Sequence, residues 1–106
     1  MSAASDKVRI LLIQPWTQPL APIRAALRDA GIDARIFRID IEVALNAALE
    51  RNGYDLAVFD PTTPAITREN LEACMREHQR YMPIVTFDGT DTLVANVRVA
   101  LAQRLN

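Results

Sequence analysis

The sequence predicts an α/β fold, in which a four-stranded parallel sheet carries helices on its faces. Four short apolar segments alternate with four segments whose apolar residues recur every three or four positions. This alternation is the pattern of β-α-β units, whose parallel strands are joined by right-handed crossovers. The length of 106 residues is close to the commonest domain size, so we expect a single domain over residues 1–106.

The first half of the chain gives two strand–helix pairs. Residues 8–13 are apolar except for one arginine, which is typical of a strand covered on both faces. The helix that follows begins among prolines, which suit a first helical turn, and ends at Gly31. Residues 32–39 predict a second, less regular strand. Asp40 is expected to cap the next helix, which stops at Gly53.

The second half of the chain gives two more pairs. Residues 56–59 predict a third strand that runs directly into Asp60. Thr67 is the expected N-cap of a third helix. Residues 84–87 predict the fourth strand, and a last helix over 91–105 has Leu and Val spaced four residues apart.

Composition excludes several classes of function. A formal net charge of −1 gives no electrostatic reason to bind nucleic acid or an anionic membrane. No segment is apolar enough to span a bilayer, and the first residues lack the apolar core of a signal peptide, so we expect a cytoplasmic protein. Cys74 is the only cysteine, which excludes an intramolecular disulfide and a Cys/His metal cluster. The isolated glycines form no phosphate-binding loop, and we expect no cofactor.

Several short strings, taken in their order and spacing, resemble the receiver domains of two-component signalling, and most closely those attached to sensory kinases. The resemblance runs from about Arg9 to Thr90 and implies a flavodoxin-like three-layer sandwich with strand order 2-1-3-4. It also implies that the family's usual fourth helix and fifth strand are absent here, so the terminal helix is expected to lie beside the first helix. The strings are RILLI at 9–13, ALRDAG at 26–31, AALER at 47–51, GYDL at 53–56, Pro64, and PIV at 83–85.

The resemblance implies that Asp60 matches the aspartate that a histidine kinase phosphorylates in this family. Receiver chemistry also needs an acidic pair that holds Mg²⁺, a hydroxyl at the end of the fourth strand and a lysine at the end of the fifth. In this chain Gln14 and Pro15 replace the acidic pair, Asp88 falls at the hydroxyl position, and no residue matches the lysine. The rim of this pseudo-active site is expected to comprise Gln14, Pro15, Trp16 and Asp88.

Two functional hypotheses follow. The first is a non-catalytic, phosphorylation-independent receiver-like module that acts through protein–protein interaction, because a phosphoryl group near Asp88 would add negative charge without a counterion. Its expected partner is a sensor kinase or another regulatory protein, and a homodimer through the edge of the fourth strand or the last helix is a further expectation. The alternative is a divergent receiver that is phosphorylated on Asp60. Direct cation binding by Asp60 and Asp88 is a minor hypothesis.

Other residues admit a functional and a structural interpretation. Trp16 could anchor a protein partner, or its ring could fold over its own loop or against Pro61. Together with the Thr62-Thr63 loop it could also line a shallow small-molecule pocket. His78 is expected to be a solvated surface residue, and Cys74 a buried apolar side chain without chemistry.

Overall fold

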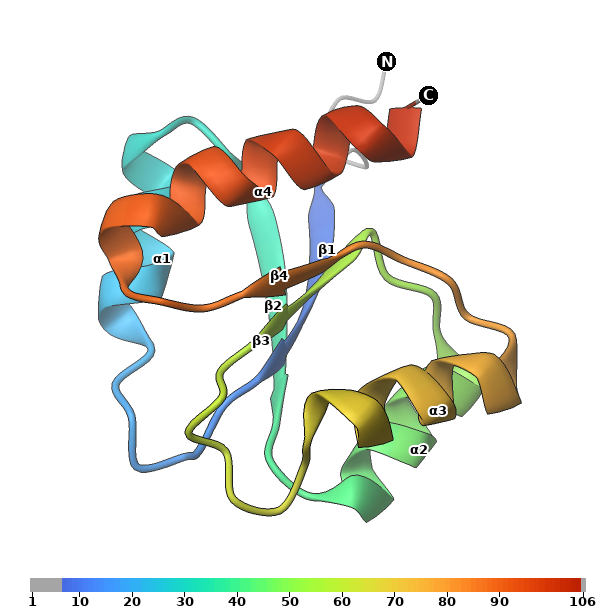
Figure 1. Ribbon diagram of the computed structural model, residues 1–106. Helices are drawn as coiled ribbons and strands as arrows, with labels where there is room; N and C mark the ends of the chain where they lie inside the picture. The colour runs from blue at the N-terminus through green and yellow to red at the C-terminus, as the bar shows by residue number, and fades with distance from the viewer. Residues whose placement is uncertain (1–6, 106) are drawn as a thin grey trace.

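The computed structural model describes residues 7–105, which form one parallel sheet with two helices on each face (Figure 1). The strand order is β2-β1-β3-β4, and every pair of neighbours is parallel, as the sequence predicted. The elements are β1 (Val8–Ile13), α1 (Ala21–Asp29), β2 (Ala34–Ile39), α2 (Glu42–Arg51), β3 (Leu56–Phe59), α3 (Arg68–His78), β4 (Ile84–Thr86) and α4 (Thr90–Leu105).

The helices divide into two layers. Helices α2 and α3 pack together on one face of the sheet, and α1 and α4 cover the other face (Figure 1). The side chain of Arg98 on α4 donates to the carbonyl of Ala30, at the end of α1, at 3.0 Å. The expectation that the last helix lies beside the first is therefore confirmed.

The alternation of side chains along the central strands builds two cores. Leu11 and Ile13 point toward α2 and α3, whereas Ile10 and Leu12 point toward α1 and α4. All four are at most 1% exposed. Because residues 10–13 of β1 and all of β3 are buried on both faces, these stretches are continuously apolar rather than alternating.

The ends of the helices confirm one capping prediction and correct another. Thr67 caps α3 in a capping box, in which the Thr67 hydroxyl accepts from the Asn70 N–H and the Asn70 side chain accepts from the Thr67 N–H. Asp40 does not cap α2. The N-cap is Ile41, without a side-chain hydrogen bond, because the helix begins one residue later than a cap at Asp40 requires.

His78 also differs from its prediction. It is partly buried, and its Nε2 lies 3.0 Å from Oδ1 of Asn46 on α2. The histidine therefore joins α2 to α3 rather than standing free in solvent.

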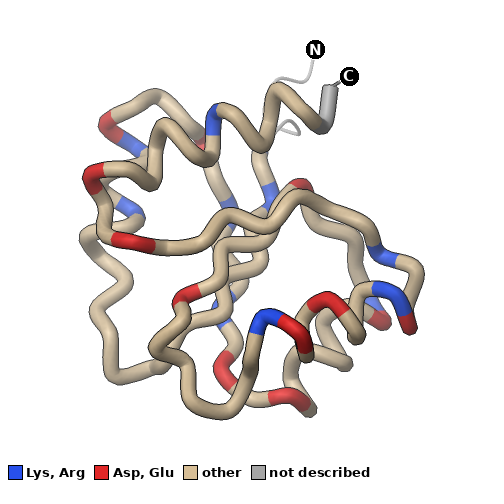
Figure 2. The backbone as a smooth tube through the Cα atoms, viewed as in Figure 1, with Lys and Arg blue, Asp and Glu red and all other residues tan. Residues whose placement is uncertain are grey.

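The charged residues are interspersed over the elements and do not gather on one side (Figure 2). This distribution agrees with a net charge near zero. No described helix is both long enough and apolar enough to cross a membrane.

Candidate functional site

The candidate site lies where β1 and β3 end, at the carboxyl edge of the sheet. Gln14 follows β1 directly and Asp60 follows β3 directly, and the backbone N–H of Asp60 donates to the carbonyl of Ile13 at 2.9 Å. The two residues are only 2% and 4% exposed, respectively. The sequence predicted that Asp60 lies at the end of a strand, and it directly follows β3. Ligands of open parallel sheets bind at this carboxyl edge.

Both carboxylate oxygens of Asp60 accept hydrogen bonds from neutral donors. Oδ1 accepts from the Thr62 N–H at 2.9 Å and from the Thr62 hydroxyl at 2.7 Å. Oδ2 accepts from Nε2 of Gln14 at 3.3 Å. The bond to the N–H two residues ahead is an Asx turn, which fixes the loop after β3. A further bond from the Thr63 N–H to the Asp60 carbonyl, at 3.0 Å, tightens the same turn.

Gln14 connects Asp60 to a cation that the sequence analysis missed. Nη1 of Arg38, near the end of β2, donates to Oε1 of Gln14 at 3.4 Å. The two neighbours fix the orientation of the Gln14 amide: in the flipped orientation the amide oxygen would face the carboxylate and the NH₂ would face the guanidinium. Arg38, Gln14 and Asp60 therefore form a short chain of polar contacts across three strand ends.

Arg38 is itself held by the β1–α1 loop. Its Nη1 donates to the Gln18 carbonyl at 2.8 Å, and its guanidinium carbon lies 4.3 Å from the centre of the Trp16 ring. An arginine among the apolar residues of β2 was the available sequence signal, but sequence spacing alone does not bring positions 14, 18 and 38 together. The Trp16 ring thus stacks on Arg38 and remains 61% exposed.

The site does not fit a magnesium ion of the receiver type. Magnesium prefers several oxygen ligands, and no group of three potential acidic, histidine or cysteine ligands occurs within residues 7–105. An N–H donor from Gln14 faces Oδ2 of Asp60, and a donor cannot coordinate a cation. Asp88 is exposed, and within the described structure no hydrogen bond or ion pair joins it to Asp60.

A surface groove adjoins the rim. Its volume is about 460 Å³, and it is lined by Trp16, Ile41 and Thr62 together with neighbouring loop residues. Pro15 also borders this groove, between the buried Gln14 and the exposed Trp16. One interpretation of Trp16 placed it in a shallow pocket with the Thr62-Thr63 loop; Trp16 and Thr62 do line this groove, whereas Thr63 does not.

The fold is similar to that of receiver domains. A structure of the receiver domain of a sensor histidine kinase from Pseudomonas aeruginosa, with a magnesium ion coordinated in its active-site cleft, superposes with a TM-score of 0.60. The similarity covers 92% of this chain and 79% of that chain, at 22% sequence identity. No protein-family model matches the sequence, and no curated protein matches it either.

Proposed function

We propose that this chain, which has the fold of a receiver domain, is a receiver-like signalling module that acts through protein contact and does not transfer a phosphoryl group. The observation that carries the proposal is the engagement of Asp60. Its oxygens accept three hydrogen bonds and its side chain is 4% exposed, so a phosphodonor would have to displace donors and open the loop to reach either oxygen.

The electrostatics of the site support the same proposal. Phosphoryl transfer to a carboxylate requires positive charge on the phosphoryl oxygens. The nearest cation in the hydrogen-bonded chain is Arg38, and the neutral Gln14 amide stands between it and Asp60. The guanidinium is also bonded to a backbone carbonyl and stacked on Trp16, which holds it at the rim of the loop.

The second candidate is a divergent phosphoacceptor, and Arg38 is the observation that favours it. A rotation of the Gln14 side chain would bring the guanidinium within reach of a phosphoryl group on Asp60. This rotation would break the bonds of Gln14 to both neighbours and the stacking of Arg38 on Trp16. We therefore favour the first candidate.

Incubation with acetyl phosphate and Mg²⁺, followed by intact-mass spectrometry, distinguishes the two candidates. We expect no phosphoryl adduct on the wild-type chain. A receiver domain that retains its acidic pair serves as the positive control, and Asp60→Asn as the negative control. A Mg²⁺-dependent adduct that Asp60→Asn abolishes would overturn the proposal.

The proposed module is not an enzyme and works in the cytoplasm. Its partners in this proposal are a sensor kinase, another regulatory protein or a second copy of the chain. The exposed rim with Trp16 and the open edge of the sheet at β4 are the two surfaces that support docking.

A further inference from the structure

The outer edge of β4 carries backbone groups that no other segment within residues 7–105 pairs with. The Pro83 carbonyl and the Phe87 N–H both bond to β3, at 2.9 and 2.7 Å. Backbone polar groups of alternate residues point to opposite edges of a strand. Ile84 and Thr86 therefore direct their N–H and C=O groups away from β3. They face the open edge, because β4 is the last strand on this side of the sheet (Figure 1).

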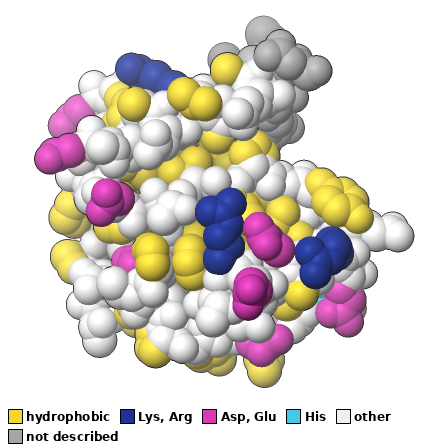
Figure 3. Space-filling model, viewed as in Figure 1, with side chains coloured by type: hydrophobic (Ala, Val, Ile, Leu, Met, Phe, Trp, Pro, Cys, Tyr) yellow, Lys and Arg dark blue, Asp and Glu magenta, His cyan; other side chains and the backbone are white. Residues whose placement is uncertain are grey.

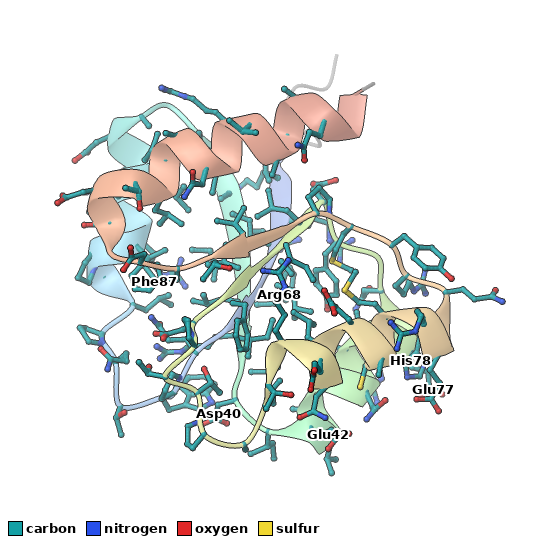
Figure 4. The ribbon with its side chains drawn as sticks, in the orientation of Figure 1. Asp40, Glu42, Arg68, Glu77, His78 and Phe87 are labelled. Atoms are coloured by element: carbon teal, nitrogen blue, oxygen red, sulfur yellow. The ribbon has the colours of Figure 1, made fainter. Side chains whose placement is uncertain are left out.

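The short length of β4, three residues, is one feature that protects edge strands from pairing, but other such features are missing from this edge. Proteins commonly protect such edges with charged residues, prolines or bulges. Residues 82–87 contain no charged side chain, and Pro83 belongs to the set of residues that faces β3, so its missing N–H does not interrupt the outer edge. Arg68, on α3, donates to the Thr86 hydroxyl at 3.1 Å (Figure 4). Its positive charge therefore lies only on the α3 side of this edge.

The surfaces beside the edge are hollowed and partly apolar. On the α4 side, a hollow of about 320 Å³ is lined by β4 and by the uncharged residues Asn96, Val99 and Gln103. On the α3 side, a second hollow of about 460 Å³ includes Tyr81 and Met82, and it is also lined by the charged residues Arg68, Glu72 and Arg76. Val99 is 57% exposed and Tyr81 is 73% exposed. In Figure 3, apolar side chains gather in the region between α4, at the top, and α3, below it.

We propose that the β4 edge pairs antiparallel with the β4 edge of a second copy of this chain. A two-fold axis beside Val85 would place Ile84 opposite Thr86 of the second copy and form one eight-stranded sheet. This inference rests on the proposed function, because it names the partner and the surface through which such a module would dock.

The hydrogen-bonding pattern of the edge is self-complementary. In an antiparallel pair, two opposed residues exchange both of their N–H···O bonds. Ile84 and Thr86 each offer one donor and one acceptor, so the two copies form four hydrogen bonds and leave no outward group of these residues unpaired.

The shortness of the edge favours a second copy over a flexible peptide. Only two residues offer outward groups, and a disordered peptide would lose about 1–2 kcal/mol of backbone entropy for each residue that it ordered. A second copy presents the same strand already folded. A stable interface also needs about 800 Å² from each copy, roughly an eighth of the chain's 6272 Å² surface, so the flanks must take part.

The flank on α4 suits contact between copies. Antiparallel strands in one sheet keep each face continuous, so the α4 helices of the two copies lie on the same side. Asn96, Val99 and Gln103 carry no charge, and no like charges oppose one another there. The dimer therefore depends on Val99 as well as on the backbone of β4.

Sedimentation velocity over a micromolar concentration series, on the full chain and three variants, tests the proposal. Thr86→Pro removes one outward N–H from each copy, and hence two of the four bonds, without altering a donor of the β3–β4 ladder. Val99→Lys introduces like charges on the α4 flank and leaves the backbone intact. Val43→Lys is the matched control, because Val43 is an exposed helical valine that does not line either hollow.

We expect a dimer in the wild-type chain and in Val43→Lys, and at least about tenfold weaker association in both other variants. Amide hydrogen exchange of Ile84 and Thr86 should slow as the wild-type concentration rises. A wild-type monomer throughout the series would overturn the proposal, as would a dimer that Thr86→Pro and Val99→Lys leave intact. Phosphoryl labelling of Asp60 would contradict the proposed function but would not change the sedimentation result, so the two failures are distinguishable.

Discussion

At the scale of single residues, Asp60 illustrates how an acid at a functional position can have a structural role. A buried carboxylate without partners would be costly, and three neutral donors satisfy this one. Two of those donors belong to Thr62, so the carboxylate also holds the loop after β3 in its turn. The hydrogen bonds that engage the Asp60 carboxylate therefore also stabilise this loop.

Asp60→Ala should therefore lower the free energy of unfolding by about 1–3 kcal/mol, since it leaves the Gln14 amide buried without its acceptor and removes the Asx turn. Asp88→Ala is the matched control at the end of the neighbouring strand. Asp88 is exposed, so we expect a change within about 0.5 kcal/mol. Urea denaturation followed by circular dichroism measures both, and equal effects of the two substitutions would contradict a structural role for Asp60.

Sequence reasoning located Asp60 and Gln14 at the rim because each directly follows an apolar strand. It did not find Arg38, because the contact depends on how the β1–α1 loop folds back over β2. It placed Asp88 at the rim from an ungapped match, and whether Asp88 contributes to any site stays a prediction. Local order along the chain thus predicted the positions of the strand ends, but not the side-chain contacts between them.

At the scale of elements, the contact between α2 and α3 buries the only thiol of the chain. Cys74 is 4% exposed and belongs to the core beneath these helices. Burial raises the pKa of the Cys74 thiol, Glu42 and Glu77 raise it further, and a hydrogen bond with the side chain of Asn46 opposes them. The two helices therefore keep the thiol protonated.

This raised pKa should make stability depend on pH in the alkaline range. Below the unfolded value of about 8.5 the thiol is neutral in both states, so it adds no pH dependence. As the pH rises above that value, the unfolded chain loses the proton first, and stability should fall by at most about 1.4 kcal/mol per pH unit until the folded pKa is passed.

Urea denaturation of the wild-type chain and of Cys74→Ala, under reducing conditions from pH 7 to pH 10, isolates this effect. The free energy of unfolding of the wild type, relative to that of Cys74→Ala, should stay constant up to about pH 8 and then decrease. A difference that stays constant over the whole range would show that burial does not perturb the thiol.

Capping shows why some element boundaries were predictable. Thr67 precedes Asn70 by three residues, and this spacing allows the reciprocal bonds of a capping box. Asp40 is also a good capping residue, but Ile41 has the extended backbone of the N-cap, so the start of α2 shifted by one residue. Residue type alone does not decide between two adjacent candidate positions.

At the scale of the whole molecule, α4 completes the second face of the sheet. Its residues Leu93, Val97 and Ala100 are buried with α1 and with the side chains of β1, β3 and β4 that face them. The alternating pattern of strands and helices predicted a parallel sheet, and the resemblance to receiver domains implied its strand order. The coverage by α4 was expected because a bare apolar face would be unstable in water. The edge of the fourth strand and the last helix were named from the sequence as candidate contact surfaces. The hollows beside β4 were not, because they depend on how α3 and α4 flank that strand.

Val97→Ala should destabilise the molecule by about 1–3 kcal/mol, because Val97 is fully buried and its truncation leaves a cavity between α4 and the sheet. Val43→Ala, at a valine that is 77% exposed on α2, should have an effect within about 0.5 kcal/mol. Differential scanning calorimetry should show a lower midpoint for Val97→Ala, by about 4–8 °C per kcal/mol. An unchanged midpoint would mean that α4 contributes little to the core.

The stacking of Trp16 on Arg38 has a practical consequence, since this is the only tryptophan in the chain. Its indole emission comes entirely from the β2 side of the carboxyl edge, and two strands, β1 and β3, lie between β2 and β4. A ligand that displaces the guanidinium should alter the emission spectrum, whereas association through the opposite margin of the sheet should leave it unchanged. The wild-type chain therefore carries a native optical probe that separates the two docking surfaces without any label.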